Sequence, residues 1–303
     1  MNIFLISLPL FIIIFLGWLL KKYQIVSNDW IHILNNFAYY VSLPAIIISS
    51  FLVIDFSDSA ILKIVFISAF TVLFFCLLIF FVLSILKIST ELKATIFVVA
   101  TIGNTIYMGL PLVELGLGNK FLPMSAVIGV IYLIIPLLIS IFAIRFWHDK
   151  RHKVWAHVWE LLKNPLTLSI FAGVILSFLN FNFPVANEIK KSITMLGSTA
   201  SPIALFALGA FIHGRFMKKD IKTVSFVVFL KMILFPLAIF LSGFYLLKTS
   251  DLRVFSLLAS TPVAVTTFVI AEKYNLNQSI VGDSIIISTI LSFIVAPLIL
   301  LIF

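Results

Sequence analysis

The chain has 303 residues, of which 62% are hydrophobic and 11% are charged, and its formal net charge is +9. Soluble domains are about half apolar and about a quarter charged, so this composition excludes a soluble globular protein. It is typical of an integral membrane protein built from apolar helices. The apolar runs are long and continuous, which excludes a membrane β-barrel with its short alternating segments.

Ten apolar stretches are long enough to cross a bilayer as helices. We expect these spans at residues 3–20, 30–53, 60–86, 94–113, 121–146, 165–180, 190–212, 222–247, 252–271 and 280–302. The first begins without a basic segment or a cleavage site, so we interpret it as a span and not as a removed signal peptide. A polar connection at 147–163 separates a first half, 1–146, from a second half, 164–303.

The basic residues lie mostly in alternate connections, of which the largest are 147–163 and 215–222. Because Lys and Arg are retained on the cytoplasmic side, these connections are expected inside and both termini outside, in the plasma membrane. This arrangement explains the positive net charge without a nucleic-acid partner. Five spans in each half place the halves in opposite orientations, which is the condition for an inverted repeat.

Residues 101–111 contain Gly103, Asn104, Gly109 and Pro111 inside an otherwise apolar span. Backbone groups that lose their partners in hydrocarbon cost on the order of 2–7 kcal/mol each, so such a break indicates a buried or cavity-lining position. The equivalent span of the second half is interrupted at Thr261-Pro262. Paired interruptions in equivalent helices of two halves indicate a binding site.

Breaking two helices creates two helix N-termini, which carry a partial positive charge and unpaired N–H groups and therefore attract anions. The amide of Asn104 and nearby threonine hydroxyls add polar groups, so a small organic anion suits this site. The alternative is that Asn104 only satisfies backbone groups freed by Gly103. The candidate substrate-binding residues are Gly103, Asn104, Thr105, Thr261, Pro262 and Val263.

Among the charged residues in or near the spans, three bear on function. Lys231 lies deep in the eighth span, five residues before Pro236, where it serves either as a counter-charge or proton carrier for the substrate or as a donor to carbonyls near a helix break. Asp283, the second coupling candidate, and Glu114 are expected at the aqueous boundary. With Cys76 as the single cysteine, no disulfide or cysteine-based metal site is expected, and no motif of an enzyme or of a cofactor site is present.

Four segments resemble the auxin efflux carrier family, which includes plant auxin exporters and bacterial malate or malonate permeases. They are Asn104-Thr105-Ile106-Tyr107-Met108-Gly109-Leu110-Pro111, Asn164-Pro165-Leu166-Thr167, Leu205-Phe206-Ala207-Leu208-Gly209 and Phe268-Val269-Ile270-Ala271-Glu272-Lys273-Tyr274-Asn275. The resemblance implies an all-α membrane protein of ten helices in two inverted five-helix repeats. Broken helices 4 and 9 would cross at the substrate, with Asn104 and Pro262 at the crossing.

The resemblance also implies a scaffold of spans 1, 2, 6 and 7, which mediates a homodimer, and a moving domain of spans 3–5 and 8–10. Three departures from the plant members stand out. Gly103 stands where they have proline, which makes this break softer, and the region Ser68–Thr71 lacks their acidic residue, which argues against auxin recognition and against coupling through that acid. The short central loop points to a prokaryotic-type permease.

The leading hypothesis is an elevator-type secondary transporter of a mono- or dicarboxylate such as malate or malonate. The alternatives are a carrier coupled to protons or sodium on a related crossing fold, and a membrane sensor or scaffold that binds a ligand without moving it.

Overall fold

A computed structural model describes residues 4–53, 59–148, 163–179, 186–215, 220–244, 247 and 249–302. Within these ranges the secondary structure is helical, apart from one isolated β-bridge. The α-helices are α1 Phe4–Lys22, α2 Asn28–Phe37, α3 Leu43–Phe51, α4 Ser59–Ile85, α5 Thr90–Thr101, α6 Leu110–Leu117, α7 Leu122–Trp147, α9 Pro165–Phe178, α10 Ala186–Ser198, α11 Ala200–Ile212, α12 Ile221–Phe229, α13 Phe235–Gly243, α14 Thr249–Ala259, α15 Thr266–Lys273 and α16 Gln278–Ile302.

Seven helical stretches in the described part are long and apolar enough to cross a membrane, and the segments 105–117 and 165–178 are shorter apolar helices. In the described part of the chain, each of the ten ranges expected from the sequence overlaps helical structure, and the ranges 94–113 and 252–271 are interrupted at 102–104 and 260–265. Most of the expected central loop, residues 149–162, lies outside the described residues. The described part of the chain is therefore all-helical, as expected for a multi-pass membrane protein.

Three of the helices are widened into a π-helical turn just before a proline. These turns are η1 Ala38–Ser42, η2 Thr105–Gly109 and η4 Leu230–Leu234, and the prolines are Pro44, Pro111 and Pro236. Each proline stands two residues after its π turn. Proline has no N–H to donate and its ring clashes with the carbonyl four residues earlier, which in all three cases belongs to the π turn. The widened turn relieves this clash.

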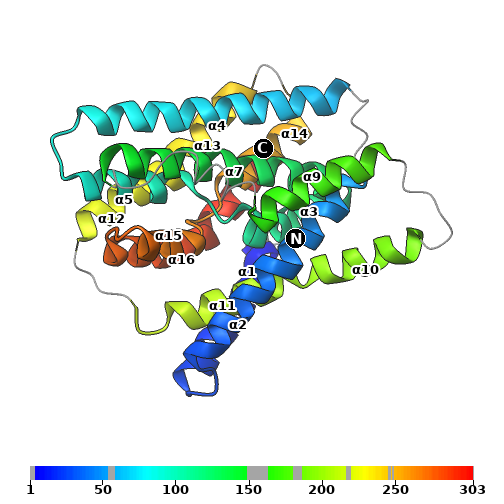
Figure 1. Cartoon of the computed structure of the whole chain (residues 1–303), viewed down its shortest axis with the longest axis horizontal. Helices are drawn as coiled ribbons and strands as arrows, with labels where there is room; N and C mark the ends of the chain where they lie inside the picture. The colour runs from blue at the N-terminus through cyan, green and yellow to red at the C-terminus, as the bar shows by residue number, and fades with distance from the viewer. Residues whose placement is uncertain are drawn as a thin grey trace.

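Helices α1 and α11 pack with their backbones in direct contact. A side chain at Gly17 or Gly209 would overlap a backbone carbonyl, that of Phe206 or Ile14 respectively. Small residues that let helix backbones approach this closely are typical of membrane proteins, where van der Waals contact drives helix association. Figure 1 shows α1, α2, α10 and α11 together in its lower part, and α3 packs against both α9 and α10.

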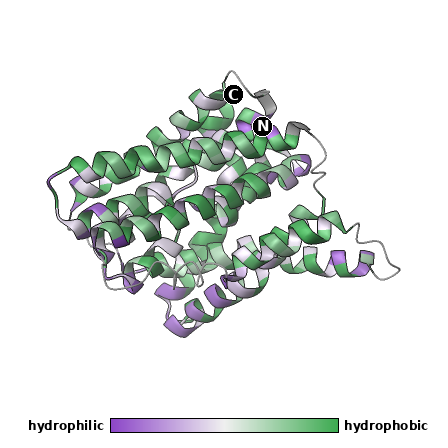
Figure 2. Ribbon diagram, turned by 45° about the horizontal axis from the view of Figure 1, so that its top comes forward, coloured by the Kyte–Doolittle hydropathy of each residue, from purple (hydrophilic) through white to green (hydrophobic). Residues whose placement is uncertain are grey.

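A second group of helices occupies the upper left of Figure 1. Helix α4 packs against α7 and α13, α5 packs against α7, and α12 packs against α16. Apolar residues cover the helices over most of their length, and polar residues gather at helix ends and connections (Figure 2). The broken segments that carry the candidate site belong to this second group, and they lie in its interior.

Candidate functional site

The two interrupted spans meet as a short antiparallel pair. Gly103 and Val263 form a β-bridge, in which the N–H of Asn104 donates to the carbonyl of Pro262 at 2.8 Å and the N–H of Ala264 donates to the carbonyl of Ile102 at 3.2 Å. Backbone groups freed by each break are thus satisfied by the other break, as a buried crossing requires. The structure brings all six predicted substrate-binding residues together at this crossing, and all six are buried.

Lys231 reaches the same crossing from the π turn η4. Its Nζ donates to the carbonyls of Ala259 at 2.8 Å and Thr261 at 2.9 Å, and it lies 4.8 Å from the ring centroid of Phe235. The side chain is fully buried. Of the two roles left open by the sequence, this geometry favours the donor to carbonyls near a helix break.

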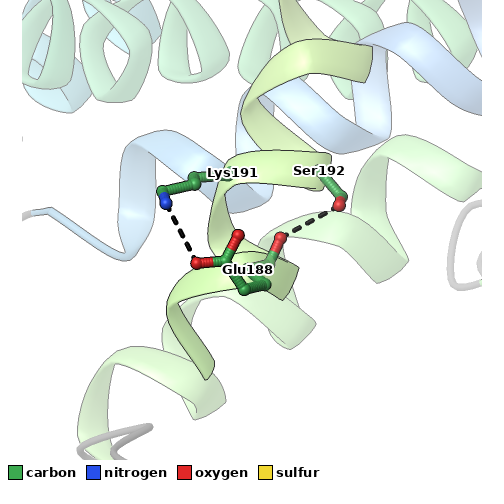
Figure 3. Close-up of polar contacts among 3 residues, drawn as sticks. All are labelled: Glu188, Lys191 and Ser192. Atoms are coloured by element: carbon green, nitrogen blue, oxygen red, sulfur yellow. Dashed lines mark hydrogen bonds and ion pairs between the residues drawn. The ribbon is translucent and has the colours of Figure 1, made fainter. Parts of the chain in front are cut away.

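No carboxylate pairs with Lys231 among the described residues. The contrast is the surface pair of Glu188 and Lys191 on α10, joined at 2.9 Å with most of both side chains in solvent (Figure 3). Ser192 also donates to the carbonyl of Glu188 there. Such exposed pairs contribute about 0–1 kcal/mol, whereas a buried amino group that meets only carbonyls brings an uncompensated positive charge when protonated.

The helix ends at the crossing favour negative charge nearby. Helix α14 ends there, and Lys231 donates to the carbonyl of its last residue, Ala259, at the negative end of the helix dipole. The π turn η2 and helix α15 begin there, and each presents the positive end of a helix, although the N–H groups of Thr267 and Phe268 already donate to the carbonyls of Ala264 and Val265. The crossing therefore presents two positive helix ends, while one negative end is already neutralised.

The polar side chains at the crossing differ in whether they have hydrogen-bonding capacity left for a ligand. Thr105 donates its hydroxyl proton to the carbonyl of Gly129 at 2.9 Å, and Thr261 donates to the carbonyl of Leu258 at 2.8 Å. Both hydroxyls are thus committed as donors. The Asn104 side chain does not cap the helix that follows it, and the hydroxyl of Thr266 is buried without a hydrogen-bond partner. Asn104 and Thr266 are therefore the side chains with free hydrogen-bonding capacity, one beside each helix N-terminus.

Helix α16 contributes a row of hydroxyls that the sequence analysis missed. Ser288 accepts the N–H of Val263 at 3.0 Å, and Ser292 lies 3.8 Å from the sulfur of Met108. The hydroxyls of Ser284 and Thr289 are buried without a partner among the described residues. The signal was available, because Ser284, Ser288 and Ser292 recur every four residues in an apolar span and so share one helix face.

The two acidic residues considered in the sequence analysis fall in different environments. Glu114 is exposed, as expected for the aqueous boundary. The expectation that Asp283 lies at this boundary is wrong, because its side chain is 1% exposed within α16. The prediction failed because α16 begins at Gln278, so that Asp283 already lies one turn inside a helix that packs against α12, α14 and α15.

Comparison with known proteins identifies the family. A family model described as membrane transport protein matches residues 3–300. A Rhizobium meliloti protein provisionally named a malonate transporter is 30% identical over 296 residues, covering 94% of this chain and 91% of that protein. An uncharacterised transporter of Methanocaldococcus jannaschii is 26% identical over 305 residues, covering 97% and 96%.

A plant protein matches over a shorter region. A protein of Oryza sativa subsp. japonica with the provisional name auxin efflux carrier component 9 is 28% identical over 147 residues, covering 47% of this chain and 34% of that protein. The family match extends over nearly the whole chain, including both broken segments and Lys231. The chain therefore belongs to the auxin efflux carrier family of membrane transport proteins, and it is a transporter and not an enzyme.

Proposed function

We propose that this protein is a secondary transporter that carries a small organic anion, a mono- or dicarboxylate such as malonate or malate, across the plasma membrane. The anion would bind at the crossing of the two broken segments. The observation that supports this proposal most strongly is the antiparallel pair of Gly103 and Val263, which brings two helix N-termini together beside the buried Lys231. Positive helix ends and a lysine without a carboxylate favour an anionic substrate over a neutral or cationic one.

The size and charge of the substrate follow from the same geometry. Two helix N-termini, each with about half a positive charge, suit one or two carboxylates, since the amino group of Lys231 already offsets the negative end of α14 beside them. In this arrangement the amide of Asn104 and the hydroxyl of Thr266 donate to the carboxylate oxygens. The malonate assigned by name to the Rhizobium meliloti relative is a compact dicarboxylate of this kind.

An inverted repeat of two five-helix halves accounts for the packing. In this repeat α9 corresponds to α1, and α11 corresponds to α3. Helix α1 packs on α11 and α9 packs on α3, so each contact becomes the other when the two halves are exchanged. The contacts of α4 with α7 and of α12 with α16 are exchanged in the same way. Equivalent segments also meet directly, because the hydroxyls of Ser42 and Thr199 lie 2.7 Å apart. The antiparallel sense of the bridge fits spans that cross the membrane in opposite directions.

We propose that transport is of the elevator type. Helices α1, α2, α3, α9, α10 and α11 would form the fixed scaffold and the homodimer contact. Helices α4–α7 and α12–α16 would move together with the bound anion. Both termini would lie outside, with the central connection 147–163 in the cytoplasm.

Uptake of radiolabelled malonate and malate into proteoliposomes tests this function. We expect saturable uptake by the wild type, a strong loss in Asn104→Ala, and wild-type uptake in the control Asn119→Ala, which removes an exposed amide far from the crossing in sequence. Uptake that is equal in all three proteins would remove Asn104 from the mechanism.

Imposed ion gradients separate the alternatives. Uptake that follows a proton or sodium gradient identifies an ion-coupled carrier of the same substrate. Saturable binding of malonate with no flux under any gradient would identify a sensor and would contradict the proposed transport.

A further inference from the structure

Gly103 lies directly against the end of the Lys231 side chain. A Cβ atom at position 103 would lie 2.8 Å from both Cε and Nζ of Lys231 and 3.0 Å from the hydroxyl oxygen of Thr261. A real Cβ atom essentially never makes contacts this short, so a side chain at position 103 requires the end of Lys231 to move. Space is therefore what demands glycine here, because the backbone of Gly103 does not adopt the positive φ that favours glycine elsewhere.

The position of Lys231 in turn fixes the second broken segment. Its Nζ holds the carbonyls of Ala259 and Thr261, on either side of Ser260 and immediately before Pro262. Those residues lead into the N-terminus of α15, where the hydroxyl of Thr266 has no partner. Displacement of Nζ would leave two buried carbonyls without their donor and would release this segment.

We propose that Gly103 is a positioning residue, whose missing side chain allows Lys231 to hold the second broken segment in the geometry that binds substrate. The inference rests on the proposed function, since it makes Lys231 act on the anion through the segment 259–266. A side chain at position 103 displaces the lysine, shifts the N-terminus of α15 and weakens binding of the anion. Gly103 and Lys231 are then an energetically coupled pair, although Gly103 lies in the break between α5 and η2 and Lys231 lies in η4.

A double-mutant cycle on melting temperature tests the coupling without any substrate. Gly103→Ala should lower the melting temperature of the detergent-solubilised protein, and it should have little further effect when combined with Lys231→Ala, which removes Cε and Nζ. The matched control is Gly116→Ala, in α6 of the same interrupted span. A Cβ there would lie 2.8 Å from a methyl carbon of Leu300 in α16, away from the segment that Lys231 holds, so its effect should be the same with and without Lys231.

Malonate uptake provides the functional readout. Gly103→Ala should raise the half-saturating malonate concentration by about threefold or more, with a smaller change in the maximal rate, because binding and not the overall fold is altered. The same substitution in the Lys231→Ala background should leave the half-saturating concentration where Lys231→Ala alone places it. A general loss of folded protein would lower the maximal rate and leave the half-saturating concentration unchanged.

Each outcome decides the proposal. If Gly103→Ala cannot be purified but the double variant can, the coupling is established by folding alone. Equal effects of Gly103→Ala with and without Lys231, in melting temperature and in uptake, would overturn the proposal. It is also overturned if neither protein with Gly103→Ala can be purified while Gly116→Ala can. If no protein, including the wild type, takes up malonate, the proposed function fails while the melting cycle still measures the coupling.

Discussion

The backbone N–H of Val263 donates to the hydroxyl of Ser288 at 3.0 Å, and this bond ties the second broken segment to α16. Both residues are buried, and the hydroxyl of Ser288 itself donates a hydrogen bond to the carbonyl of Ile285. The partner strand leaves the N–H of Val263 free, since the bridge uses the groups on either side of it. A side chain from a third segment is therefore needed to satisfy this donor in the membrane interior.

Ser288→Ala should destabilise the protein by about 1–3 kcal/mol, because it leaves the N–H of Val263 buried without an acceptor. The control is Ser292→Ala in the next turn of the same helix. Its hydroxyl donates to the carbonyl of Thr289 and otherwise meets only the sulfur of Met108 at 3.8 Å, so its loss should cost less. Thermal unfolding in one detergent measures both variants. Equal shifts would mean that the bond to Val263 carries no special weight.

Pro236→Ala should lower malonate uptake by repositioning Lys231. Alanine restores the N–H and removes the clash with the carbonyl of Met232, so the π turn η4 can revert to a regular α-helix. A regular α-helical turn holds one residue fewer than a π turn, so this reversion would rotate the helix before it by about 100°. That rotation would carry Lys231 away from its two carbonyls.

The control for this substitution is Pro297→Ala, in a helix that accommodates its proline without a π turn. Initial rates of uptake at saturating malonate, normalised to the amount of reconstituted protein, compare the two. Retention of uptake in both variants would show that the π turn is not needed to place Lys231.

A disulfide between the two proposed groups of helices should stop transport. The rings of Phe211 in α11 and Phe268 in α15 meet edge to face with centroids 4.9 Å apart, and the guanidinium of Arg215 lies over both. In a Cys76→Ser background, the pair Phe211→Cys and Phe268→Cys joins the scaffold to the moving group. Oxidation should abolish uptake, and reduction should restore it.

The pair Phe80→Cys and Phe146→Cys is the control, because these rings lie 5.4 Å apart between α4 and α7, within the moving group. Its oxidation should leave uptake intact. The elevator proposal is contradicted if the disulfide between the groups forms, as judged by mobility on a non-reducing gel, and uptake continues.

The sequence was sufficient for the helices and for the position of each break, because both depend on local chemistry. Continuous apolar runs define membrane helices, and Gly103, Asn104 and Pro262 are residues that a helix in hydrocarbon tolerates only with help from elsewhere. The pairing of the two breaks followed from their equivalent places in the two halves. The family match, which covers residues 3–300, is consistent with the segments that resembled the auxin efflux carriers.

The remaining features depend on contacts between distant segments. Lys231 could have faced the substrate or the carbonyls of α14, and only packing decides between these. Asp283 was misplaced because one helical turn separates an exposed position from a buried one. The role of Ser288 could not be assigned, because a serine in a membrane helix commonly bonds to its own backbone, and its second bond joins residues 25 positions apart.

The central claim is that the anion binds where the two broken segments cross, and protection of an introduced cysteine tests it most directly. Thr266→Cys, in a Cys76→Ser background, replaces a hydroxyl without a partner at the N-terminus of α15. Labelling of this cysteine by a small maleimide should slow as malonate is added, and the half-maximal effect should match half-saturation of uptake. Thr90→Cys, exposed at the start of α5, should label at one rate throughout. Labelling of Thr266→Cys that is unchanged by malonate, in a protein that still transports it, would place the substrate elsewhere.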